Sequence, residues 1–315
     1  MAIESTDAIL ASPWIKQRPR DVRELVRMSC TNRSYDDMCD QTSVTITGDC
    51  RRGGVVNFEA FDTRVHPLDA IAFLSTPFQV IVENEWFDGS FLLWMAKALG
   101  FGRLIEAYRQ GRFVFRHAGG KDSIPRSAAV FSKGVWPRRN GGYERAFRLW
   151  LCVLLDNDAK YPGDTPNANI IEQTKDHVTF VHQLRRRSIE SYIPAQRLRK
   201  LDNTPAFHRK IDALLNLTDE QRLHYHMKKG FKFDRKTTPH KKNYLASDSV
   251  RIEEKRLFQS IDDEDWEHLM DGLGRSLSDI YVDEPHRPNP NDSTMTNQQD
   301  RNELSTLIKA IYERI

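Results

Sequence analysis

The sequence predicts an α/β fold in which helices flank a mostly parallel sheet. Short apolar runs alternate with helical patterns over residues 76–195, as successive βαβ units require. The apolar run from Leu149 to Leu155 has no polar interruption, which is typical of a strand that is buried on both faces of a parallel sheet. An N-terminal α+β extension precedes this region, and a helical region follows it. We therefore expect a Rossmann-like domain with additions at both ends.

The expected elements follow the chain in a regular order. Strands are predicted at 78–83, 113–117, 148–155 and 178–184, and helices at 90–99, 104–109 and 124–131. In the C-terminal part, helices are predicted at 205–217, 218–229, 250–260, 262–273 and 301–315. The second of these starts at a capping box, Thr218 to Gln221.

We divide the chain into four expected parts. They are an N-terminal α+β extension at 1–75, an α/β domain at 76–195, a basic helical region at 196–282 and a linker with a terminal helix at 283–315. The stretch Ser43–Asp62 alternates on both sides of a Gly-rich turn and predicts a β-hairpin.

Bulk composition describes an ordinary protein. The chain has 315 residues, of which 39% are hydrophobic and 29% charged, enough to build a sizeable core. Cys152 falls inside an expected strand, and Cys30, Cys39 and Cys50 lack zinc-ligand spacing. No apolar run reaches the length of a membrane span, so we expect a cytoplasmic protein.

Carboxylates follow three of the expected strands. Glu83 ends the first strand, Asp156 and Asp158 end the third, and Glu190 comes shortly after the fourth. Ligands of open α/β sheets bind at the carboxyl ends of the strands. In an extended chain, residues two apart point to one side, so Asp156 and Asp158 could direct two oxygens at one Mg²⁺. A single acid at a strand end is more often a solvated turn or cap, and the hypothesis depends on the order of all of them.

That order resembles the Toprim fold. This fold is the catalytic domain of topoisomerases, bacterial primases and nucleases of the OLD (overcoming lysogenisation defect) family. The matching segments are Val80–Glu83, Ala118–Lys121, Leu154–Asp158 and the Arg-x-x-x-Glu-x-Tyr element Arg186–Tyr192. The last element resembles the one that closes the site of OLD-like nucleases, so it favours a nuclease.

The resemblance has departures. Asn84 stands where the family has Gly, and Asp88 lies five residues after Glu83 instead of four, which leaves Glu85 as a competitor. No Walker A motif is present, so the ATPase half of OLD nucleases is missing. The resemblance therefore implies a stand-alone protein or the nuclease subunit that works with a separate ATPase in anti-phage defence.

The resemblance implies a metal-dependent nuclease. One or two Mg²⁺ or Mn²⁺ ions would be held by carboxylates, namely Glu83, Asp88, Asp156, Asp158 and Glu190. Lys121 and Arg186 would stabilise the charge that develops on the phosphorane. DNA or RNA would be the partner, and a homodimer would suit cleavage of both strands.

The segment from Arg185 to Lys242 is basic. It holds 16 Lys and Arg against 6 Asp and Glu, which suits a polyanion partner as well as a solvated face. Tyr225, Phe231 and Phe233 are interleaved with these cations, and anchoring to the core is a simpler interpretation than base stacking. His224 and His226 are two apart, so they would not converge on one metal from a helix.

Several alternatives stay open. The chain could be a catalytically silent scaffold that binds an ATPase or nucleic acid. It could also be a ribonuclease for structured RNA such as tRNA, or a priming enzyme. An α/β enzyme that does not act on nucleic acid is a further alternative, but it leaves the four acids and the basic segment unexplained. Topoisomerase action is disfavoured, because no obvious domain supplies a nucleophilic tyrosine, although Tyr192 and Tyr244 stay open as candidates.

Overall fold

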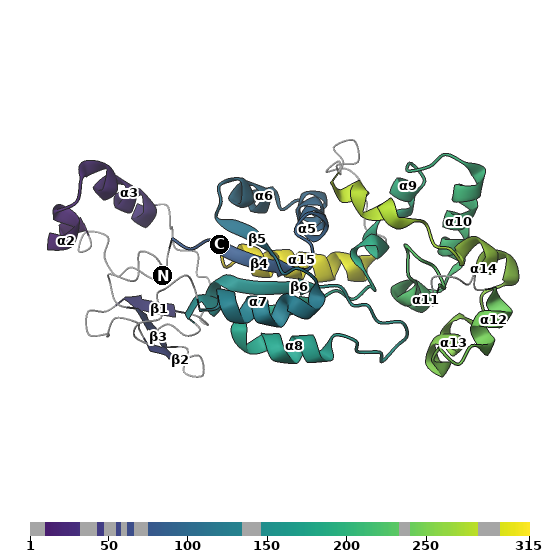
Figure 1. Cartoon of the computed structure of the whole chain (residues 1–315). Coiled ribbons are helices and arrows are strands. Elements are labelled where there is room, and N and C mark those ends of the chain that lie inside the picture. The colour runs from purple at the N-terminus through teal and green to yellow at the C-terminus, as the bar shows by residue number, and fades with distance from the viewer. Residues whose placement is uncertain are drawn as a thin grey trace. The chain divides into compact units, whose positions relative to one another are not determined.

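The computed structural model describes residues 10–31, 43–46, 55–57, 62–65, 75–133, 146–232, 240–282 and 297–315. The chain forms two compact units, residues 1–75 with 136–146 and residues 76–135 with 147–315. Figure 1 shows the elements along the chain. All the predicted site residues belong to the second unit.

The first unit contains short helices and a small sheet. Its elements are α2 (Pro13–Lys16), α3 (Arg20–Thr31), β1 (Ser43–Ile46), β2 (Val55–Asn57) and β3 (Asp62–Val65). The predicted hairpin between β1 and β2 is wrong, because β3 lies between them, parallel to β1 and antiparallel to β2. Alternation identified β1 and β2 as strands but could not identify the partner of either, and β3 was not recognised. The predicted Gly-rich turn lies outside the described residues.

The second unit is built around a four-stranded parallel sheet. Its strands are β4 (Phe78–Val82), β5 (Phe113–His117), β6 (Leu151–Leu155) and β7 (Phe180–Gln183). They lie in the order β5-β4-β6-β7, and every neighbouring pair is parallel. The predicted α/β fold is confirmed, and the carboxyl ends of all four strands meet at one edge.

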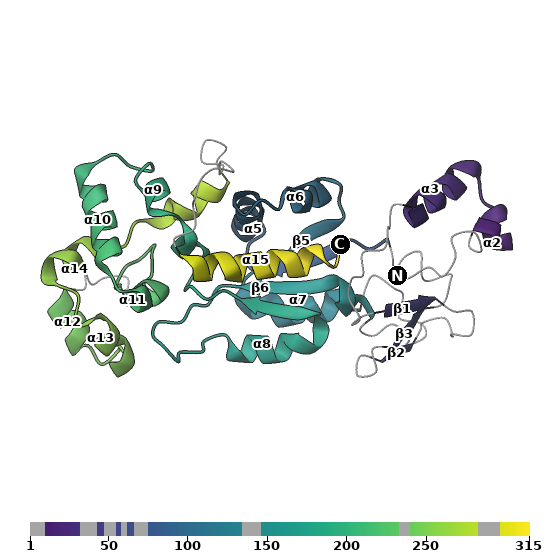
Figure 2. The ribbon, with the colours of Figure 1, turned by 180° about the vertical axis from the view of Figure 1, so that it is seen from behind.

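Alternate residues of β4 and β6 explain the layers on the two faces of the sheet. Val80, Val82, Cys152 and Leu154 belong to one apolar cluster, with α5 (Phe87–Ala98), α6 (Gly102–Arg109) and α15 (Gln298–Tyr312). Ile81, Leu151, Val153 and Leu155 belong to the other, with α7 (Ile124–Phe131) and α8 (Ala168–Thr174). Figures 1 and 2 show these layers from opposite sides. Burial on both faces is why these strands read as unbroken apolar runs.

Short helices follow the sheet. They are α9 (Ala195–Leu198), α10 (Pro205–Asn216), α11 (Asp219–His224), α12 (Lys241–Ala246), α13 (Ile252–Phe258) and α14 (Asp263–Leu269). Single-turn or 3₁₀ segments lie at Lys121–Ser123, Ala146–Trp150, Lys175–His177, Ile189–Tyr192 and Arg275–Tyr281. The capping box that starts α11 is confirmed, with Thr218 and Gln221 bonded reciprocally.

The helix α11 is shorter than predicted. It ends at His224 instead of continuing towards Lys229, and Tyr225 is already extended. The Tyr225 hydroxyl donates to the carbonyl of Leu269 at 2.6 Å, which draws the chain into the core. Gly230 has a φ of +63°, and a Cβ there would lie 2.2 Å from the same carbonyl oxygen. The two loops therefore approach more closely than any side chain at this position would allow.

Aromatic side chains fill the centre of the helical region. Phe231 stacks on Trp266 with ring centroids 3.9 Å apart, and Tyr225 and Tyr244 pack around them. All four are buried. The interpretation of Tyr225 and Phe231 as core anchors is confirmed, whereas Phe233 lies outside the described residues.

One apolar cluster joins the helical region to the sheet. It includes residues of β4 and α5 together with Tyr225, Trp266 and the buried face of α15. The predicted boundaries after residues 195 and 282 therefore fall within a single compact unit. Within the described parts of the chain, none of the helices combines the length and apolarity that crossing a bilayer requires.

Candidate functional site

Acidic side chains gather where the strands of the second unit end. Glu83 follows β4, Asp156 and Asp158 follow β6, and Glu190 lies in the 3₁₀ turn after β7. The first turn of α5 adds Asp88. We call Glu83, Asp88, Asp156, Asp158 and Glu190 the acid cluster.

The loop after β4 places Asp88 and leaves Glu85 outside. Asn84 accepts hydrogen bonds from the backbone N–H groups of Trp86 and Phe87, while its own N–H donates to Asp88 Oδ2 at 2.8 Å. This reciprocal arrangement starts α5 and fixes the Asp88 carboxylate. Glu85 is exposed and is not among the main causes of the pKa shifts of Glu83 and Asp88. The local chain therefore brings Asp88, and not Glu85, to the cluster.

The loop after β6 bends sharply at Asp158. Its φ of 59° lies in the left-handed region, which non-glycine residues adopt uncommonly. Its backbone N–H donates to the carbonyl of Arg187 at 2.8 Å. Because β6 ends at Leu155 and Asp158 is left-handed, the extended geometry that we expected for Asp156 and Asp158 is wrong. The contact with Arg187 holds the bend instead.

Two further contacts complete this loop. Asp156 Oδ1 accepts a hydrogen bond from the N–H of Ile189 at 3.0 Å. Lys121 Nζ lies 3.0 Å from Asp158 Oδ2. Gly119 and Gly120, both with positive φ, form the turn that delivers Lys121 from β5. Two of the predicted site residues, Lys121 and Asp158, are therefore in direct contact.

The carboxylate of Glu190 is buried and fully engaged. Oε1 contacts Lys228 Nζ at 2.6 Å and accepts from Ser278 at 2.5 Å, and Oε2 accepts from Ser188 at 2.6 Å. Burial alone would raise the pKa of Glu190, but Lys228 and these hydrogen bonds lower it below its usual value. Glu190 is therefore an ionised group.

Three acids of the cluster, Glu83, Asp88 and Asp156, have pKa values shifted in the opposite direction. Burial raises the pKa of Asp88 to about 7, and the nearby carboxylates of Glu83 and Glu190 add to the effect. Burial likewise raises the pKa of Asp156 well above its usual value, with Asp88 and Glu190 adding to it. Glu83 is exposed as a residue, but desolvation of its carboxyl and the charge of Asp158 raise its pKa. These shifts show acids crowded together without enough positive charge.

The charge of the cluster is unbalanced. Among the described residues, five carboxyl groups face the ammonium groups of Lys121 and Lys228, and the Arg187 guanidinium adds an electrostatic interaction with Asp158. Lys228 was counted in the basic tract but was not predicted as a site residue, because it lies in the helical region far from the strands in sequence. No local pattern would have revealed it, and only the long-range packing brings it to Glu190.

The donor set fits a hard divalent cation in its chemistry. All the candidates are carboxylate oxygens, which Mg²⁺ and Mn²⁺ prefer, and the excess of negative charge would be relieved by such an ion. Among the described residues, however, no three acidic, histidine or cysteine side chains converge closely enough to hold one ion. Metal binding would therefore require the cluster to contract, with side chains such as Glu83 and Asp158 reorienting.

Arg186 has a different role from the one predicted. Its guanidinium is buried and pairs with Asp300 of α15, with Nη2 2.8 Å from Oδ2. Arg187 donates to the carbonyl of His224 at 2.9 Å. The Arg186 side chain thus anchors the segment to α15, and we do not assign to it the stabilisation of a phosphorane.

Neither Tyr192 nor Tyr244, the two tyrosines considered as nucleophiles, is accessible to solvent. Tyr192 is buried and donates to Glu303 at 2.7 Å, and Tyr244 is buried and donates to Glu254 at 2.6 Å. Burial raises the pKa of both phenols above the usual value. Both hydroxyls therefore form hydrogen bonds inside the protein, which further disfavours topoisomerase chemistry.

The two histidines, His224 and His226, have different surroundings. His224 Nδ1 lies 3.1 Å from the carbonyl oxygen of Ala159, an ordinary structural hydrogen bond. Burial, with Arg187 and Lys229 nearby, lowers the pKa of His226 to about 4. His226 is therefore neutral at physiological pH.

Comparison with known proteins adds no identification. No family model, no curated protein and no solved structure matches this chain. The functional argument therefore depends on the geometry and charge of the second unit.

Proposed function

We propose that this chain is a metal-dependent nuclease that cleaves phosphodiester bonds of DNA or RNA, with a Toprim-like site. The observation that carries the proposal is the acid cluster at the carboxyl edge of the parallel sheet, where burial and neighbouring carboxylates raise the pKa values of Asp88 and Asp156. Sites that perform chemistry often carry such shifts. The edge itself is where α/β proteins bind ligands.

Each group then has a stated task. Glu83, Asp88, Asp156 and Asp158 would hold one or two Mg²⁺ or Mn²⁺ ions, with Glu190 as the remaining carboxylate. Such an ion, when bound, activates water and stabilises the leaving oxygen. Lys121 and Lys228 lie at the acids and would neutralise the phosphate as negative charge develops on it.

Trp86 suits contact with a nucleobase. It is 63% exposed, an unusual state for tryptophan, and it lies three residues after Glu83. Its backbone is held by the hydrogen bond to Asn84. Exposed aromatic side chains stack on unpaired bases, so we assign Trp86 to substrate binding.

The experiment compares the wild type with Asp156→Asn and with Glu85→Gln as a matched control. Glu85 is exposed in the same edge region but lies outside the cluster, and both variants replace one carboxyl group by an amide. Mn²⁺ binding is measured by calorimetry, and cleavage of plasmid DNA and structured RNA is measured in Mg²⁺ and in Mn²⁺. We expect Asp156→Asn to lose binding and cleavage and Glu85→Gln to retain both. Absence of Mn²⁺ binding by the wild type would refute the proposal.

A silent scaffold is the second candidate. It is favoured by the engagement of both Glu190 oxygens and by the lack of three converging ligands in the described residues. Under this alternative the wild type binds nucleic acid or an ATPase partner, and Asp156→Asn leaves that binding unchanged. Metal binding without cleavage would instead indicate a nuclease that requires its partner.

A further inference from the structure

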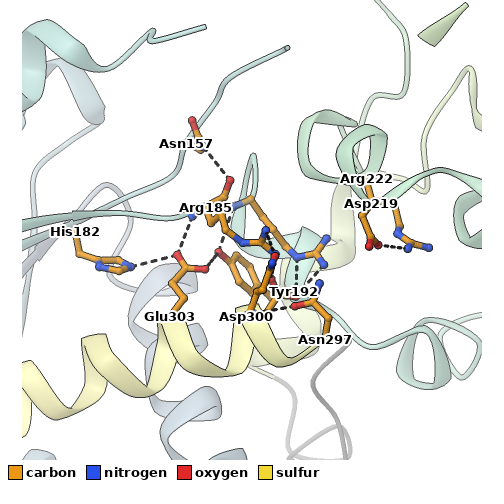
Figure 3. Close-up of polar contacts among 11 residues, drawn as sticks. Asn157, His182, Arg185, Tyr192, Asp219, Arg222, Asn297, Asp300 and Glu303 are labelled. Carbon is orange, nitrogen blue, oxygen red and sulfur yellow. Dashed lines mark hydrogen bonds and ion pairs between the residues drawn. The ribbon is translucent and has the colours of Figure 1, made fainter. Parts of the chain in front are cut away.

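We infer that the C-terminal helix α15 positions the metal-binding segment, with Asp300 and Glu303 as the positioning residues. The inference rests on the proposed function, because the segment in question carries Glu190 and contacts Asp156 and Asp158. Figure 3 shows the polar contacts that join the helix to this segment. We call them the α15 network: Asp300 and Glu303 with Arg185, Arg186, Tyr192 and His182.

Asp300 binds two arginines at once. Its carboxylate is completely buried, and Oδ1 accepts from Arg185 Nη2 at 2.9 Å while Oδ2 accepts from Arg186 Nε at 2.9 Å. Its backbone N–H is capped by the side chain of Asn297 at 2.8 Å. The start of α15 is thereby fastened to consecutive residues of the loop after β7 (Figure 3).

One helical turn after Asp300, the side chain of Glu303 accepts hydrogen bonds from the backbone and from a tyrosine of the same loop. Oε1 accepts from the N–H of Arg185 at 2.7 Å, and Oε2 accepts from the Tyr192 hydroxyl at 2.7 Å. The Tyr192 hydroxyl also accepts from the N–H of Arg186 at 3.2 Å. His182 Nε2 of β7 lies 3.3 Å from Oε1. Glu303 thus defines the path of the chain on both sides of Glu190.

The fastened loop in turn supports the acid cluster. The carbonyl of Arg185 accepts from Asn157 at 2.9 Å, and the carbonyl of Arg187 accepts from the N–H of Asp158 at 2.8 Å. The N–H of Ile189 donates to Asp156 at 3.0 Å. Three successive links therefore run from α15 through the loop to residues 156, 157 and 158. A shift of the loop would shift both aspartates.

The docking of α15 onto the core does not depend on the α15 network. Leu304, Leu307, Ile308 and Ile311 of α15 are buried in the core and supply the apolar docking. Buried ionic groups add little net stability compared with apolar replacements, but they fix direction. Outer partners of metal ligands hold those ligands in place in the same way. The apolar face would therefore dock the helix, and Asp300 and Glu303 would set the position of the loop.

The test separates docking from positioning. Glu303→Gln keeps the shape but cannot accept from both Arg185 and Tyr192, and Tyr192→Phe removes the bridging hydroxyl alone. Ile308→Val weakens apolar docking of the same helix and leaves the network intact. The first measurement is hydrogen exchange of the Asp158 and Ile189 amides in the metal-free protein. We expect faster exchange in Glu303→Gln and Tyr192→Phe, and exchange at the wild-type rate in Ile308→Val.

The second measurement is Mn²⁺ affinity by calorimetry. We expect the dissociation constant to rise by about tenfold in Glu303→Gln, in line with other outer partners of ligands, and to stay unchanged in Ile308→Val. Equal effects in both variants, or no effect in Glu303→Gln and Tyr192→Phe, would overturn the inference. A wild type that binds no Mn²⁺ would refute the proposed function, and the exchange rates would still decide the positioning role.

Discussion

The second unit contains two groups of buried acidic side chains that differ in their charged partners. In the α15 network, Asp300 has no exposure to solvent and meets two guanidinium groups. In the acid cluster, Asp88 and Asp156 meet other carboxylates, and desolvation raises their pKa values. The first region is compensated within the chain, whereas the second is left short of positive charge.

The contrast indicates what each region is for. A compensated buried carboxylate fixes geometry, because it can be satisfied only when its partners occupy defined positions. A crowded set of uncompensated carboxylates destabilises the folded chain, and such local conflicts are expected where a ligand supplies what is missing. This contrast supports the proposed cation site at the acid cluster and gives no reason to expect one at Asp300.

Removing Asp300 should produce the largest loss of stability. Asp300→Ala removes the carboxylate partner of the buried Arg186 guanidinium, and breaking such a buried ion pair lowers the free energy of unfolding by about 3–5 kcal/mol. Urea unfolding at pH 7 measures this change. Asn302→Ala, an exposed position on the same helix, is the control. A loss below about 1 kcal/mol, the range of exposed pairs, would contradict the contrast.

Removing the Asp88 carboxylate should have the opposite effect on stability, raising the free energy of unfolding. Its pKa is about 7 in the folded protein against a usual value of 3.8. Below pH 4 the group is protonated in both states and adds no penalty. As the pH rises from about 4 to 7, the unfolded chain loses its proton first, so folding becomes less favourable, and above pH 7 the penalty is constant.

Asp88→Asn should therefore stabilise the metal-free protein at pH 8. The gain is at most about 4 kcal/mol, since one pKa unit corresponds to about 1.4 kcal/mol. It is reduced because an amide oxygen is a weaker acceptor than a carboxylate for the N–H of Asn84. Near pH 4 the gain should vanish. Urea unfolding in a chelator at both pH values measures the difference. A variant that is less stable than the wild type at pH 8 would show that Asp88 is compensated after all.

The same contrast explains which features could be predicted from sequence. The strand β5 and the helix α7 have the predicted ends, because periodicity and flanking residues act locally. The acids at the strand ends were also predictable, since a parallel sheet brings its carboxyl ends together. The local sequence pattern was therefore sufficient to predict both the element boundaries and the acids at the strand ends.

The partners of those acids were not predictable, because they are distant in sequence. Ser278 lies 88 residues from Glu190, and Glu303 lies 111 residues from Tyr192. The partner of Arg186 was not predictable for the same reason, since Asp300 follows 114 residues later. The left-handed bend at Asp158 likewise depends on a contact with Arg187. Compensation of charge is thus a property of tertiary packing.

Trp86 provides the smallest expected effect and tests whether the uncompensated region meets nucleic acid. Trp86→Ala should weaken binding of single-stranded DNA or RNA by about 1–3 kcal/mol, the range for stacking of one base. Trp86→Phe keeps an aromatic ring and should retain most of the affinity. Because the side chain is 63% exposed, neither change should lower the unfolding temperature appreciably. Fluorescence anisotropy in Ca²⁺ with labelled oligonucleotides measures binding without relying on cleavage. Equal affinities of the wild type and Trp86→Ala would leave the acid cluster as a metal site but remove its aromatic contact with a base.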